Sequence, residues 1–206
     1  MTTHLHRSPL HLANALTALR VVLTPVFAGL VATDAGGWWG WVAVLVFAVV
    51  ALTDVVDGRV ARRAGTASGA GRVFDHVADI GFLLAALGAY VAIGVAPWWV
   101  PAAIAAAFMT YVATTRLAPS LGGPRRGARI GHLGGIANFV VVGILVCNHT
   151  AGLHWLGTGV MCAVFALVPA YSTLAVAASL AAAIATHRPR REHRALGALS
   201  DRGRWR

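Results

Sequence analysis

Six apolar segments occupy most of this 206-residue chain, and each is long enough to cross a lipid bilayer. A helix needs roughly 20 apolar residues to span the hydrocarbon core. Only 12% of the residues are charged, whereas a soluble domain carries about 25%. The sequence therefore predicts an all-α integral membrane protein with six transmembrane helices, at residues 13–33, 38–60, 74–95, 97–117, 132–150 and 158–186.

The positive charges lie in alternate connections between these segments. The chain has no lysine. Apart from Arg20 inside the first segment, its arginines lie near the N-terminus, around the second and fourth connections, and in the tail, while the other three connections have none. Positive residues mark the cytoplasmic side of a membrane protein, so both termini are predicted to be cytoplasmic. Basic residues between apolar segments favour anionic lipid headgroups rather than nucleic acid as partners.

The segments group into one domain with two short extensions. Residues 13–187 form the predicted six-helix domain, and residues 188–206 form a basic C-terminal tail. Residues 1–12 mix leucine with histidine and arginine, which fits either an interfacial helix or a disordered tail. They lack the features of a cleaved signal peptide, so we expect all six spans in the mature protein.

Four of the seven acidic residues fall within 26 positions, DVVDGRVARRAGTASGAGRVFDHVAD, residues 54–79. Asp54 and Asp57 are three residues apart, and Asp75 and Asp79 are four apart, so each pair shares one helix face. Glycine and serine between the pairs can reverse the chain. Two antiparallel helices would then direct four carboxylates to one point at the cytoplasmic interface.

Clustered carboxylates of this kind point to divalent cations. Oxygen ligands favour Mg²⁺, Mn²⁺ or Ca²⁺, and two such ions suit displacement at phosphorus. One carboxylate near the acceptor could take a proton from an incoming hydroxyl. A structural alternative is helix capping and ion pairing with the nearby arginines. Another class is a cation channel or transporter, which would place acids along a path across the bilayer rather than at one face.

The same stretch resembles the CDP-alcohol phosphotransferase family. All eight signature positions are present, as Asp54-x2-Asp57-Gly58-x2-Ala61-Arg62-x8-Gly71-x3-Asp75-x3-Asp79. The segment NALTALRVVLTP at 14–25 is similar to the first helix of the phosphatidylglycerophosphate synthase and cardiolipin synthase branch. The resemblance implies transfer of a phosphatidyl group from a CDP-linked lipid donor to a small or lipid alcohol, with release of CMP.

The resemblance also implies roles for the signature residues. It makes the first three aspartates metal ligands and Asp79 the general base, which also shares a metal, with two Mg²⁺ or Mn²⁺ ions expected. Arg62 would contact donor phosphate and Ala61 would leave space beside the cytidine, while Gly58 and Gly71 would let the nucleotide approach the backbone. A homodimer is expected on the same basis. The location expected is the plasma membrane, and the arginines predict an active site that faces the cytoplasm.

The residues that would bind the acceptor lie outside the eight signature positions. The branch often has DPVADK where this chain has DHVADI, so His76 replaces a proline. His76 could bind acceptor phosphate or form a hydrogen bond at a helix start, and we favour the helix start. Arg116 and Arg129 are candidates for an anionic acceptor, first glycerol 3-phosphate, then phosphatidylglycerol or an inositol phosphate. Arg20, inside an apolar segment, could reach either toward the acidic site or toward the cytoplasmic interface.

Overall fold

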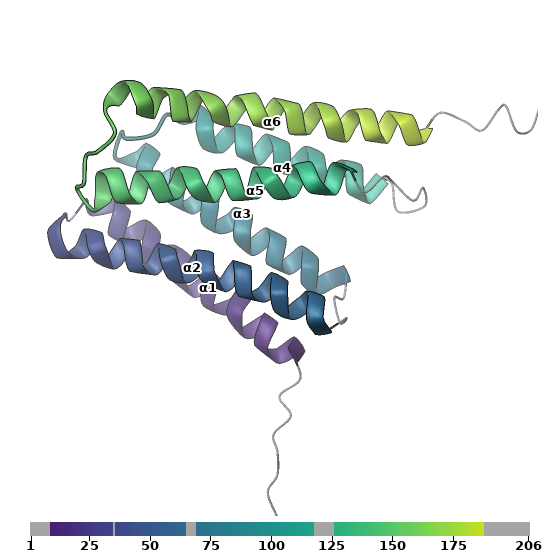
Figure 1. Cartoon of the computed structure of the whole chain (residues 1–206), viewed down its shortest axis with the longest axis horizontal. Coiled ribbons are helices and arrows are strands. Elements are labelled where there is room, and N and C mark those ends of the chain that lie inside the picture. The colour runs from purple at the N-terminus through teal and green to yellow at the C-terminus, as the bar shows by residue number, and fades with distance from the viewer. Residues whose placement is uncertain (1–8, 35, 65–68, 118–125, 188–206) are drawn as a thin grey trace, which may run out of the picture.

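The computed structural model is built of helices (Figure 1). It describes residues 9–34, 36–64, 69–117 and 126–187, with side chains at 15–34, 36–56, 74–113, 134–178 and 180–181. No strand occurs among these residues. The elements are α1 (Pro9–Ala32), α2 (Gly37–Ala64), α3 (Gly69–Ala92), α4 (Trp99–Leu117), α5 (Arg126–Leu145), the π-helical segment η1 (Val146–Thr150) and α6 (Thr158–His187).

The all-helical prediction is confirmed, with one helix for each apolar segment. Four of the helices contain a stretch long and apolar enough to cross a membrane, at Ala15–Ala32, Gly37–Val56, Phe74–Ala92 and Thr158–Ala178. The apolar parts of the other two helices are shorter, at Trp99–Ala113 and Gly134–Thr150. Six membrane crossings therefore stay a prediction, as do the positions of the termini.

Two helices extend further than predicted around the acidic stretch. Helix α2 continues to Ala64, and α3 begins at Gly69 rather than at residue 74. Alanine and arginine are good helix formers, so the basic end of α2 continues the helix. Gly71, predicted to lie in the turn, is helical, and residues 65–68 lie outside the described residues.

The helices alternate in direction along the bundle, so the acidic residues of α2 and α3 gather at one end. α1 packs on both α2 and α3 in one layer, and α6 packs on α4 and α5 in the other (Figure 1). The end that contains the last turns of α2 and the first turns of α3 is here called the Asp end. The opposite end, here called the Trp end, contains the starts of α2 and α4 and therefore the exposed tryptophans Trp38, Trp39, Trp98 and Trp99.

An aromatic layer joins the two layers of helices. Phe82 of α3 stacks on Phe139 of α5 with ring centroids 6.0 Å apart, and Phe27 of α1 lies 5.2 Å from Phe82. Phe47 of α2 completes the layer, 6.3 Å from both Phe27 and Phe139. Phe82 is fully buried and lies three residues beyond Asp79, about 4.5 Å along the helix axis. The layer therefore lies just inward of the acidic residues.

The Trp end is closed by a tight contact between α2 and η1. A Cβ added to Gly40 would lie 2.0 Å from the carbonyl oxygen of Thr150. The buried hydroxyl of Thr150 is 2.6 Å from that of Tyr90 on α3, and the Asn148 side chain accepts a 2.8 Å hydrogen bond from the backbone N–H of Leu156. These contacts connect η1 with α2 and α3 and with the segment that leads into α6.

Candidate functional site

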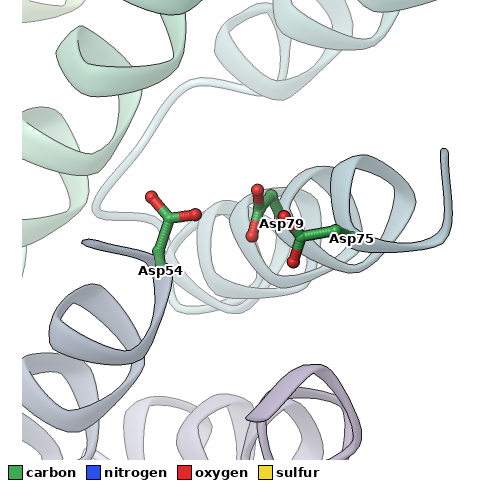
Figure 2. A group of neighbouring side chains, drawn as sticks. All are labelled: Asp54, Asp75 and Asp79. Atoms are coloured by element: carbon green, nitrogen blue, oxygen red, sulfur yellow. The ribbon is translucent and has the colours of Figure 1, made fainter. Parts of the chain in front are cut away.

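Three carboxylates from two helices converge at the Asp end (Figure 2). Asp54 is on α2, while Asp75 and Asp79 are one turn apart on α3, as their four-residue spacing requires. Each offers an oxygen, and these three oxygens all lie within 4.8 Å of one another. The side chains are partly buried, with exposed fractions of 38%, 34% and 16% in chain order. The predicted convergence of the two helices is thus present for these three residues.

A fully buried arginine lies among these carboxylates. Arg20 comes from α1, and its Nη1 donates to Asp75 Oδ1 at 3.0 Å and also to Asp79 Oδ1. Its Nη2 lies 3.8 Å from Asp54 Oδ1. The sequence left open whether Arg20 reaches toward the acidic site or toward the cytoplasmic interface. In the structure it lies in the acidic site. A single guanidinium thus contacts three aspartates from two other helices.

Helix α1 supports this arrangement one turn to either side of Arg20. The Thr17 hydroxyl donates to Asp75 Oδ1 at 3.3 Å, so two residues of α1 contact the same carboxylate. Thr24 donates its hydroxyl to the backbone carbonyl of Arg20 at 2.8 Å. Pro25 follows and cannot donate the usual backbone hydrogen bond inside the helix. The sequence NALTALRVVLTP therefore supplies a charged and a neutral partner for the acidic cluster.

The three carboxylates suit a divalent cation of the hard type. In an octahedral Mg²⁺ site with bonds of about 2.1 Å, ligand oxygens lie about 3.0 to 4.2 Å apart. The observed spread of up to 4.8 Å needs only small side-chain adjustments to reach this range. Among the described side chains, these three carboxylates and one guanidinium sum to a charge of −2, which one such ion would neutralise.

The remaining signature residues lie on the same helices. Asp57 is on α2, three residues after Asp54, and its side chain lies outside the described ones. The same holds for the residues predicted to bind the donor, which lie in the last turns of α2 or the first turn of α3: Gly58, Ala61, Arg62 and Gly71. Arg116 lies near the end of α4 and Arg129 near the start of α5, both toward the Asp end.

His76 is not at a helix start, so the favoured interpretation of this residue is wrong. Helix α3 begins at Gly69, two turns before His76. The exposed imidazole faces α4 instead, with its ring centroid 5.8 Å from that of Tyr111 and 6.1 Å from that of Phe108. His76 directly follows Asp75 on α3, and its exposed imidazole packs near the phenol of Tyr111 on α4.

Sequence relatives agree with this site. The family described as CDP-alcohol phosphatidyltransferase matches residues 10–169. A Mycobacterium tuberculosis protein named probable phosphatidylglycerophosphate synthase is 34% identical over 161 residues, or 76% of each chain, in strains CDC 1551 and H37Rv. A Mycobacterium bovis protein with the provisional name cardiolipin synthase is 33% identical over 86 residues, 42% of this chain and 40% of its own.

The family match confirms the resemblance carried by the eight signature residues, and it includes all three clustered aspartates, Arg20 and the aromatic layer. It also decides between the two classes of protein that the acidic cluster left open, because a cation channel is not expected to carry this signature. The chain belongs to the CDP-alcohol phosphatidyltransferases, the membrane enzymes of phospholipid biosynthesis that join an alcohol to a group carried on CDP.

Proposed function

We propose that this enzyme transfers a phosphatidyl group from a CDP-linked lipid to glycerol 3-phosphate and releases CMP. The observation that carries the reaction type is the convergence of Asp54, Asp75 and Asp79 at one end of the bundle in a chain of this family. The 34% identity to a protein named probable phosphatidylglycerophosphate synthase, over three quarters of both chains, supports the acceptor.

The proposed chemistry is a displacement at the phosphorus atom that carries the lipid. The acceptor hydroxyl oxygen forms a bond to this phosphorus, and the phosphoanhydride bond to CMP breaks. Asp79, the least exposed of the three aspartates, takes the proton of the hydroxyl as general base. CMP leaves with the electrons of the broken bond, so the atoms and charges balance.

The acidic side chains would bind the divalent ions that such a displacement needs. Asp54, Asp75 and Asp79 would hold one ion, and Asp57 would join them for a second, with Mg²⁺ or Mn²⁺ preferred by their oxygen ligands. Bound there, the metal would neutralise charge that develops on the phosphate and on the leaving group. The donor nucleotide would lie along Gly58, Ala61, Arg62 and Gly71.

The acceptor would approach from the side of α4 and α5. His76 lies exposed beside Asp75 and packs near Tyr111, and Arg116 and Arg129 lie toward the same end of the molecule. Guanidinium groups bind phosphate through two parallel hydrogen bonds. We propose that these three residues bind the phosphate of glycerol 3-phosphate.

The proposed location is the plasma membrane, with the Asp end toward the cytoplasm. The arginines cluster in the connections at this end, which is the arrangement that the positive-inside rule requires. Water-soluble substrates such as glycerol 3-phosphate and the product CMP would then exchange directly with the cytoplasm. A homodimer is also proposed, on family resemblance.

The test is CMP release by the purified protein with CDP-diacylglycerol. Glycerol 3-phosphate, phosphatidylglycerol and inositol phosphate are offered separately, each with Mg²⁺, with Mn²⁺ and with a chelator. We expect metal-dependent CMP release that is fastest with glycerol 3-phosphate, and a lipid product containing both phosphates. Faster reaction with phosphatidylglycerol would overturn the acceptor and favour a cardiolipin-type enzyme, while release that persists with the chelator would contradict the metal requirement.

A further inference from the structure

Arg20 lies among the three carboxylates, where a positive charge is strongly stabilised. It is fully buried and contacts one oxygen on each of Asp54, Asp75 and Asp79. A charge buried among apolar helices is costly unless it is paired. In the absence of any other cation, Arg20 therefore neutralises part of the cluster and reduces repulsion among its three carboxylates.

A divalent ion would need the same oxygens that Arg20 now contacts. Asp75 Oδ1 is 3.0 Å from Nη1, and Asp79 Oδ1 accepts a hydrogen bond from the same nitrogen. Two positive groups on these two oxygens would repel each other strongly, because Arg20 is fully buried and Asp79 is only 16% exposed, so water screens the charges little. Metal and guanidinium are thus competitors for one set of ligands.

The repulsion between them would fall when an anion enters. If the metal displaces the Arg20 guanidinium from Asp75 and Asp79, the guanidinium needs another hydrogen-bond acceptor. The diphosphate of the CDP-linked donor provides oxygens that match the planar, forked set of guanidinium N–H groups. The metal gains the same diphosphate as a ligand. The two cations would then share an anion instead of competing for carboxylates.

We propose that Arg20 is a resident cation that competes with the divalent metal for Asp75 and Asp79, and so makes tight metal binding depend on the diphosphate of the donor. This inference rests on the metal site in the proposed function and adds a role for Arg20 in controlling when it fills. The residue acts on the metal site and on the donor, and it exchanges no proton in the reaction.

The experiment measures Mn²⁺ affinity by titration calorimetry on purified full-length protein, with and without CDP. Without CDP, Arg20→Gln should bind Mn²⁺ about tenfold more tightly than the wild type, because the competing charge is gone. The factor by which CDP increases Mn²⁺ affinity should be about five times smaller in this variant than in the wild type. Arg20→Lys, which keeps a competing charge, should stay within about threefold of the wild type without CDP.

Thr17→Val is the matched control on the same helix. It removes a neutral hydrogen bond to Asp75 without changing charge, so it should not tighten Mn²⁺ binding. Equal or weaker Mn²⁺ binding by Arg20→Gln than by the wild type would overturn the competition. Tightening by Thr17→Val to the level of Arg20→Gln would overturn it too, because the effect would then not come from charge.

A measurement on the wild type alone keeps the inference testable if Arg20→Gln does not fold. Addition of Mn²⁺ should raise the melting temperature by several degrees more in the presence of CDP than in its absence, each shift being measured against the same sample without Mn²⁺, because ligands that bind the folded state stabilise it according to their affinity. Equal shifts with and without CDP would overturn the coupling. A wild type that binds no Mn²⁺ even with CDP would instead contradict the metal site of the proposed function.

Discussion

At the residue scale, the site combines aspartates whose relative positions follow from the sequence with an arginine whose position does not. The four-residue spacing of Asp75 and Asp79 places them on one face of any helix, and they lie so in the structure. Arg20 is separated from them by more than 50 residues. The sequence of a helix alone does not indicate which other helix a given side chain will face. The place of Arg20 among the carboxylates follows from the packing of α1 against α2 and α3.

Replacement of Asp79 by asparagine tests the general base. Asparagine has nearly the same shape but cannot take a proton at neutral pH, so CMP release should fall by a factor of about 10² to 10⁴. The measurement is kcat with saturating donor, acceptor and metal, on protein that elutes as the wild type does in size exclusion. A variant with half of the wild-type rate or more would exclude Asp79 as the base.

Asp34→Asn is the control for that substitution. It makes the same chemical change at the Trp end, where the exposed Asp34 carboxylate lies 3.4 Å from Nε2 of His149. Because Asp34 lies at the opposite end of the bundle from the carboxylate cluster, CMP release should remain within about twofold of the wild type, as is usual for surface substitutions with effects below about 0.5 kcal/mol. A large loss in both variants would indicate a general effect of removing a carboxylate from the bundle.

His76 offers a second test at the residue scale, directed at the acceptor. His76→Ala removes an exposed imidazole beside Asp75 without removing a member of the carboxylate cluster. If His76 binds acceptor phosphate, KM for glycerol 3-phosphate should rise by about tenfold, the loss expected for one hydrogen bond to a charged group. KM for the CDP-linked donor should stay unchanged, and an equal rise in both would place His76 outside the acceptor site.

At the element scale, the length of each apolar segment predicted each helix. Around the acidic stretch, however, it ended α2 too early and began α3 too late. The continuation of α2 to Ala64 and the start of α3 at Gly69 lie in polar sequence, where hydrophobicity gives no signal. Local propensity was the better guide there, since ARRA favours helix. The close contact of α2 with η1 also could not be predicted, because it depends on which faces of two distant helices meet.

Gly40→Ala tests whether that contact stabilises the fold. The added methyl carbon would lie 2.0 Å from the Thr150 carbonyl oxygen, so α2 and η1 would have to move apart. Overpacking of this kind costs about 1 to 3 kcal/mol, which should lower the melting temperature measured in detergent. Gly29→Ala is the matched helical control, because nothing lies within 4 Å of its added carbon, and it should leave the melting temperature equal or raised.

The result for the pair of variants decides the role of the contact. A loss of stability in Gly40→Ala alone would assign the close approach of α2 and η1 to the native packing. Equal behaviour of both variants would mean that the Trp end tolerates a wider separation of these helices. CMP release by Gly40→Ala should remain near the wild-type rate at low temperature, because Gly40 lies at the end opposite to the carboxylate cluster.

At the scale of the whole molecule, the arrangement assigns different tasks to the two ends. Three of the four described acidic side chains cluster at the Asp end, and the phenylalanine layer separates them from the Trp end, where Asp34 lies. A path for ions through the bundle would have to cross this layer, whereas an enzyme needs access from one side only. The alternation of arginines in the sequence predicted the same asymmetry before any packing was known.

This asymmetry predicts an orientation of the molecule in the membrane that can be measured with reporter fusions. Alkaline phosphatase, which is active only outside the cytoplasm, should be active when inserted after Gly36 or Gly152 at the Trp end, and inactive when fused after Arg206. A fluorescent protein that matures only in the cytoplasm should give the opposite pattern. Because arginine in short connections sets the orientation, activity of alkaline phosphatase at Arg206 would contradict a cytoplasmic Asp end, and activity at only one of the two Trp-end positions would contradict six crossings.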